Sequence, residues 1–148
     1  MTSDFLEKTL EDIIFENYKV IKNVGLPVMY SNIQRQFSLP SGKIIDLITW
    51  EITDNILFLN IIELKRKTGS YSALSQLLNY VNEVVCHTVG RFKRIDIKCI
   101  VICKEIDKDF NNILLINPQN LFIYTYKYDI NGVCFKLFDE SMDLIMRL

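Results

Sequence analysis

Two carboxylates and a lysine stand in apolar parts of this sequence. Glu63 and Lys65 follow an apolar run that starts at Ile56, and Asp46 interrupts a second run at residues 44–48. Side chains two positions apart in an extended chain lie on the same face, so we expect the Glu63 carboxylate and the Lys65 amine to converge. A carboxylate inside an apolar strand, as at Asp46, requires a partner or a metal ion.

The chemistry open to these side chains depends on how the two runs pair. In a hairpin that turns near Asp54, Asp46 lies opposite about residue 62 and therefore close to Glu63, within a register error of one residue. Adjacent carboxylates repel each other unless a cation neutralises them, and Mg²⁺, for which Mn²⁺ can substitute, prefers such oxygen ligands. An ion held by Asp46 and Glu63 could activate a water molecule that Lys65 positions, so phosphodiester hydrolysis is the expected reaction.

Three consecutive strands are predicted around these residues. Residues 33–39 alternate between apolar and polar side chains, and residues 40–42 supply a turn. Residues 44–52 and 56–65 are rich in β-forming side chains and are separated by the turn-forming residues 53–55. The expected arrangement is antiparallel throughout.

Two amphipathic helices and a returning strand complete the predicted core. Leucine and isoleucine recur at helical spacing in residues 4–17, and leucine and valine do so in residues 72–87. Residues 95–106 form a strand that rejoins the sheet through a crossover connection. The remaining predicted elements are a short helix near residues 107–112, strands at 121–128 and 133–138, and a helix from about residue 140.

Size and composition fit one folded domain. The chain has 148 residues, of which 49% are hydrophobic and 24% charged. We predict a single domain over residues 1–148 of the α/β class. Its αβββαβ core has a mixed central sheet flanked by helices, followed by a C-terminal β-hairpin and helix. The apolar runs fall short of the roughly 20 residues that cross a bilayer, and the N-terminus lacks a secretory signal, so an intracellular protein without a membrane span is expected.

Charge and histidine content argue against several functional classes. The net charge of −1 disfavours nonspecific coating of nucleic acid, because such binding scales with the number of phosphates neutralised. His87 is the only histidine, so a His-rich zinc site and most Ser-His-Asp or Cys-His schemes would have to use that residue. The low net charge also means that any contact with nucleic acid must be local.

Two short basic clusters are predicted at the ends of elements near the carboxylates. Arg66 and Lys67 continue from Lys65, while Arg91 and Lys93 follow the second helix. They are either candidate phosphate contacts or solvated surface charge.

Alternating tyrosines mark one predicted strand near the C-terminus. Tyr124, Tyr126 and Tyr128 either form a stacking face for bases or, as we prefer, one face of a sheet packed on the C-terminal helix.

The order of these residues resembles a known nuclease superfamily. Asp46, followed after a hairpin by Glu-Leu-Lys at residues 63–65, looks like the signature of the PD-(D/E)XK restriction and repair nucleases. Gln76 and Tyr80 reproduce the QxxxY helix motif of its RecB-like branch. Residues 4–106 are similar to the nuclease domain of NucS-type endonucleases. There are two departures from the pattern, a longer spacing before Asp46 and the lack of a preceding proline.

The resemblance implies a restriction-endonuclease-like fold and a Mg²⁺-dependent deoxyribonuclease with DNA as its partner. It implies that Glu11 is a further acidic residue near the metal, and that the backbone carbonyl of Leu64 is a metal ligand. Gln76 would orient the catalytic groups or bind the substrate backbone, and Tyr80 would support the site or contact the substrate.

An alternative function and several properties remain open. The chain could be a nuclease-fold nucleic-acid-binding or assembly module whose activity depends on a partner. The sequence does not decide between DNA and RNA, single and double strands, or endonuclease and exonuclease action. A domain this small needs a dimer or two separate visits to break both strands, so a homodimer is preferred.

Overall fold

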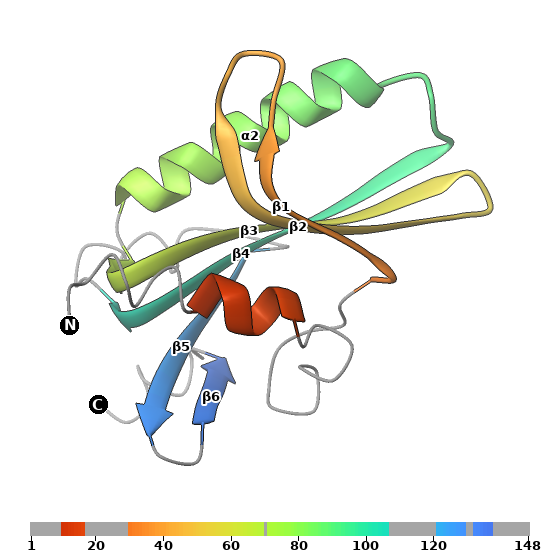
Figure 1. Cartoon of the computed structure of the whole chain (residues 1–148). Coiled ribbons are helices and arrows are strands. Elements are labelled where there is room, and N and C mark those ends of the chain that lie inside the picture. The colour runs from red at the N-terminus through yellow and green to blue at the C-terminus, as the bar shows by residue number, and fades with distance from the viewer. Residues whose placement is uncertain (1–9, 17–29, 70, 107–120, 130–131, 138–148) are drawn as a thin grey trace, which may run out of the picture.

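The computed structural model in Figure 1 describes residues 10–16, 30–69, 71–106, 121–129 and 132–137. The helices predicted near residues 107–112 and from residue 140 lie outside these ranges. In the ranges described, no helix combines the length and the hydropathy that crossing a membrane requires.

A mixed six-stranded sheet is the centre of the described structure, with its strands in sequence order. Neighbours in β1–β2–β3 are antiparallel, those in β3–β4–β5 are parallel, and β5–β6 is antiparallel. The strands are β1 (Asn32–Ser38), β2 (Ile44–Thr53), β3 (Ile56–Gly69), β4 (Arg94–Ile106), β5 (Leu121–Asp129) and β6 (Gly132–Leu137). The predicted α/β class and mixed sheet are confirmed, and the second hairpin extends the same sheet.

Two helices cover opposite faces of the sheet. Helix α2 (Tyr71–Thr88) connects β3 to β4 and packs with one apolar cluster, which includes Leu77, Ile61 and Val101. The first helix, residues 10–16, packs with a second cluster on the other face. Figure 1 shows α2 above the sheet and the first helix, in red, below it. Each helix buries part of the apolar stripe that its periodicity predicts: Leu10 and Ile14 of the first helix and Leu77 of α2 are buried, whereas Leu78 and Val85 of α2 are exposed.

Tyr124 and Tyr126 of β5 belong to the second cluster. Tyr124 and Tyr126 are 4% and 8% exposed and share this cluster with Leu10 and Ile14 of the first helix. Their burial confirms the prediction of a packed sheet face and excludes a base-stacking surface at these two rings. In the described part of the chain the first helix reaches this core. The C-terminal helix on which packing was predicted lies outside the described residues, so that part stays a prediction.

The β2–β3 hairpin sets the register that places the predicted catalytic residues. Asp54 and Asn55 have φ angles of 53° and 60°, as a two-residue type I′ turn requires. The ladder runs from this turn to Leu47–Ile62. Continuing that register puts Asp46 opposite Glu63, within the one residue that the prediction allowed around position 62, because the turn centre lies between Asp54 and Asn55.

Strand β2 changes direction at Asp46. Ile45 packs in the cluster on the α2 side, whereas Leu47, two positions later, packs in the cluster on the opposite side. A regular strand would place both on one face. Across from Asp46, the β1–β2 register skips Gln36, which has a φ of 51°. The hairpin of β1 and β2 therefore leaves the plane of the sheet and curls toward α2 (Figure 1).

Candidate active site

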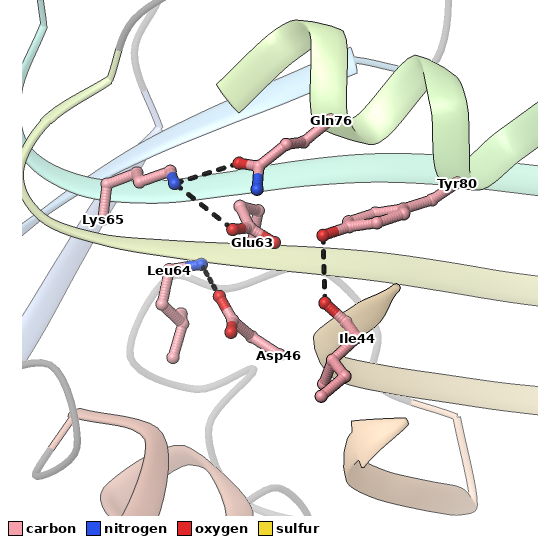
Figure 2. A network of polar contacts seen from close by, with 7 residues as sticks. All are labelled: Ile44, Asp46, Glu63, Leu64, Lys65, Gln76 and Tyr80. Carbon is pink, nitrogen blue, oxygen red and sulfur yellow. Dashed lines mark hydrogen bonds and ion pairs between the residues drawn. The ribbon is translucent and has the colours of Figure 1, made fainter. Parts of the chain in front are cut away.

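Strand β3 and helix α2 bring three predicted residues together, as Figure 2 shows. The Lys65 ammonium lies 3.3 Å from Glu63 Oε1 and donates a hydrogen bond of 3.0 Å to Gln76 Oε1. Glu63 is 5% exposed, and the Lys65 side chain is about a quarter exposed. The prediction that Glu63 and Lys65 share a face is confirmed, and Gln76 joins them from the helix above.

Asp46 lies where β2 parts from β3. Its Oδ2 accepts a hydrogen bond of 2.8 Å from the backbone N–H of Leu64, just past the last ladder pair, Leu47–Ile62. The carboxylate thus takes the place of a backbone carbonyl as the acceptor for β3. Burial raises the pKa of Asp46 above its ordinary value, although the Leu64 N–H and the Lys65 charge both lower it.

This donor set fits a hard divalent cation. Asp46 and Glu63 face each other across the end of the ladder, and Lys65 supplies one positive charge against their two carboxyl groups. Among the residues that the structure describes, no three His, Cys, Asp or Glu side chains form a group. Mg²⁺ commonly uses one or two carboxylates and fills its other positions with water and substrate phosphate. The arrangement therefore suits Mg²⁺ better than a cation that needs a full cage of side chains.

Glu11 approaches the pair from the other side of the sheet without joining it. Its carboxylate accepts a hydrogen bond of 3.0 Å from Gln36 Nε2, next to the distorted part of β1. Burial raises the pKa of Glu11, and the negative charge of Asp46 raises it further. The structure thus places Glu11 within electrostatic reach of Asp46, and its role as a metal ligand stays a prediction.

Tyr80 supports the backbone of β2. Its ring is 4% exposed, and its hydroxyl donates a hydrogen bond of 2.9 Å to the carbonyl of Ile44, two residues before Asp46. Burial, with the negative charges of Glu63 and Asp46, raises the pKa of Tyr80 to about 12. The hydroxyl is therefore a neutral donor at physiological pH, and its position fits support of the site and not contact with substrate.

The second basic cluster lies far from these carboxylates. Arg94 pairs with Ile56 at the start of β3, whereas Glu63 pairs with Val101. Seven residues of extended chain correspond to about 23 Å. The prediction that Arg91 and Lys93 are near the site was wrong, because a parallel crossover returns the chain to the end of the sheet where the preceding strand began.

The first basic cluster continues β3 beyond the site. Arg66 and Lys67 lie where the β3–β4 register shifts, between Lys65 and Thr68. The placement of their side chains lies outside the described structure, so their contact with nucleic acid stays a prediction.

Two contacts near Asp46 were missed by the sequence analysis. Gln36 holds Glu11, and the Glu83 carboxylate binds Ser41 in the β1–β2 turn. Glu83 follows Gln76 by seven residues, which is two helical turns, so helical spacing places both on one flank of the helix, although it does not predict the contact with Ser41. No sequence signal distinguishes Gln36 from the other polar residues of β1.

Comparisons with known proteins agree with this fold. Residues 6–125 match the family model described as the endonuclease NucS C-terminal domain. A crystal structure of a repair endonuclease from Pyrococcus abyssi has a TM-score of 0.56 and 21% identity, over 78% of this chain and 44% of that one. The structure of an EndoMS–dsDNA complex has a TM-score of 0.53 and 17% identity, over 84% and 46%. This chain thus spans less than half of either protein, and no curated protein matches it.

Proposed function

Since this chain belongs to the family of endonuclease NucS C-terminal domains, we propose that it is a Mg²⁺-dependent nuclease domain that hydrolyses phosphodiester bonds in DNA. The observation that carries the proposal is the meeting of Asp46, Glu63 and Lys65 where β2 leaves β3. In this proposal residues 63–65 and Asp46 form the PD-(D/E)XK signature, with Gln76 from α2 as part of the QxxxY motif.

The roles of the side chains follow from their contacts. Asp46 and Glu63 would hold Mg²⁺, with the carbonyl of Leu64 as a further ligand, and the bound ion would supply an activated water and stabilise charge on the phosphate. Lys65 has three donor hydrogens, of which Glu63 and Gln76 orient two. The third is available to position the attacking water or to bind a phosphate oxygen.

A partner-dependent module is the alternative function. The net charge of −1 gives the chain little general attraction for phosphates, so groups supplied by another polypeptide could complete its activity. A second copy of this chain is one such polypeptide, because two copies would place two sites on one duplex. In this alternative the isolated chain binds DNA and does not cut it.

Cleavage of labelled single-stranded DNA, double-stranded DNA and RNA tests the proposal, in Mg²⁺, in Mn²⁺ and in EDTA. We expect DNA cleavage with either metal and none in EDTA. Glu63→Gln and Lys65→Ala should each lower kcat by about 10²–10³-fold, because each removes a charge placed for the transition state. Glu51→Gln, which makes the same charge change at an exposed position on β2, should cleave like the wild type.

Two outcomes would contradict the proposal. Cleavage that persists in Glu63→Gln or in EDTA would exclude this site as the source of activity. Binding of DNA without cleavage of any substrate would favour the partner-dependent module.

A further inference from the structure

Helix α2 holds the turn between β1 and β2 through one carboxylate. Glu83 accepts two hydrogen bonds from Ser41, at 2.8 Å from the backbone N–H and at 2.7 Å from the hydroxyl, although the residues are 42 positions apart. These bonds, the Ser41 hydroxyl first, lower the pKa of Glu83, with smaller contributions from Lys43 and His87. Glu83 is therefore an acceptor at neutral pH.

The turn that Glu83 holds is closed internally. The N–H of Leu39 donates to the Lys43 carbonyl at 2.7 Å, and the N–H of Gly42 donates to the Leu39 carbonyl at 2.8 Å. Gly42 has a φ of 92°, which favours glycine. A displacement of Ser41 is therefore passed on to Lys43 and to the start of β2.

Asp46 itself lies outside the strand pairing and is held by its neighbours. The β2–β3 ladder ends at Leu47, and the β1–β2 register skips Asp46. On one side the sheet fixes Leu47. On the other side Ile44 and Ile45 pair with β1, and α2 holds this hairpin through Glu83 at Ser41 and through Tyr80 at the Ile44 carbonyl.

We propose that Glu83 is a positioning residue for the Asp46 carboxylate, acting through the β1–β2 turn. The proposal rests on the proposed function, in which Asp46 holds the metal ion. Without Glu83, α2 would hold this segment through the Tyr80 hydrogen bond to Ile44 and through the apolar packing of Leu39 and Ile45, but no longer through the turn residue Ser41. Asp46 would then spend less time in the position from which it accepts the Leu64 N–H. Groups that orient metal ligands typically change metal affinity or activity by about 10–100-fold when they are removed.

An ordinary surface hydrogen bond is the competing interpretation, since Glu83 lies at the edge of α2. In that case removing Glu83 would lower the melting temperature without any change at Asp46. Hydrogen exchange at the Leu64 amide distinguishes the two interpretations, because the Leu64 N–H donates directly to Asp46. The Ile61 amide, which lies within the paired part of β3, serves as an internal reference.

The experiment measures amide hydrogen exchange by NMR in the metal-free protein. We expect Leu64 to exchange about tenfold faster in Glu83→Ala than in the wild type, with Ile61 unchanged. Ser41→Ala, which removes one of the two hydrogen bonds, should have a smaller effect in the same direction. The double variant should be no worse than Glu83→Ala, because both substitutions act through one contact. Glu51→Gln is the charge-matched control.

Two further readouts use the same variants. Calorimetric titration with Mn²⁺ should give about tenfold weaker binding for Glu83→Ala. With DNA as substrate, kcat should fall while KM stays within twofold of the wild type. If Glu83→Ala does not fold, Ser41→Ala decides the question by the same measurements.

Unchanged Leu64 exchange and unchanged Mn²⁺ affinity in a folded Glu83→Ala protein would overturn the positioning role, whatever the melting temperature. The nuclease function and the positioning role of Glu83 can be contradicted independently. A wild-type protein that cuts no nucleic acid contradicts the nuclease function, whereas the exchange of the Leu64 amide still reports whether Glu83 positions Asp46.

Discussion

Asp46 illustrates how a candidate catalytic residue weakens the fold that holds it. Burial raises the pKa of its carboxyl group, so the folded protein binds the proton more tightly than the unfolded chain does. Protonation of Asp46 therefore stabilises the fold below the unfolded pKa, and that contribution is lost as the pH rises through the folded pKa. At neutral pH without a cation, the ionised carboxylate is a net cost to stability.

Removing this charge should stabilise the metal-free protein. The amide introduced by Asp46→Asn would keep an oxygen that can accept the Leu64 N–H, and Lys65 would keep Glu63 as its partner. We expect a free energy of unfolding about 0.5–2 kcal/mol higher than that of the wild type at pH 7. The difference should vanish below about pH 4, where the unfolded aspartate is also protonated.

Urea denaturation at the two pH values, in EDTA, measures this difference. A variant that is less stable than the wild type at pH 7 would show that the contacts of the Asp46 carboxylate outweigh its burial. In that case Asp46 would be a structural residue.

At the scale of elements, the first helix is held to the sheet by two kinds of contact. Ile14 is fully buried in the cluster beneath β2, β3 and β4. Arg35 of β1 forms an ion pair with Asp12 and lies 4.8 Å from the centre of the Phe15 ring. Both partners of the ion pair are more than a third exposed, so solvent screens their attraction.

The buried contact should dominate the docking of this helix. Ile14→Ala should lower the free energy of unfolding by about 2–5 kcal/mol, because it leaves a cavity inside a buried core that cannot fully collapse around it. Arg35→Ala should lower it by about 1–2 kcal/mol at most, from the loss of the ion pair and the ring contact. Denaturation of both variants in urea tests this order. A larger loss of stability for Arg35→Ala would show that the surface contacts dominate the docking of the helix.

Periodicity predicted the elements, and contacts between distant residues decided their finer geometry. The strands β1, β2 and β3, the turn at Asp54 and helix α2 have local signals, and each formed where it was predicted. The curl of β2 at Asp46 is different in kind, because Glu83 and Tyr80 hold it from far along the chain. No local pattern in residues 41–46 encodes that contact.

The residues of the candidate site also fall into those that local patterns predict and those whose position depends on distant contacts. Glu63 and Lys65 were predictable because period-two geometry puts them on one face, and the resemblance identified Gln76. The position of Arg91 and Lys93 depends on the parallel register of β3 with β4, which their own sequence does not specify. Sequence therefore located the residues of the site better than it located their surroundings.

At the scale of the whole molecule, the proposed site and the second basic cluster lie near opposite ends of β3. The proposed site lies near Lys65, and Arg91 and Lys93 are exposed near the opposite end of the strand, about 23 Å away. With a net charge of −1, binding must come from local contacts. A duplex that runs along β3 from the site would reach the basic pair after about seven base pairs, at roughly 3.4 Å each.

This geometry predicts that the effect of the basic pair depends on duplex length. In Arg91→Ala/Lys93→Ala, affinity should fall only for duplexes that extend at least about ten base pairs from the scissile phosphate in that direction. For those duplexes the slope of log K against log salt should decrease by about two, one for each lost phosphate contact. Duplexes with about four base pairs on that side should bind both proteins equally, and kcat at saturating DNA should not change because neither residue touches the reacting phosphate. Fluorescence anisotropy across a series of lengths and salt concentrations measures all of this, and equal affinities at every length would assign Arg91 and Lys93 to solvated surface charge.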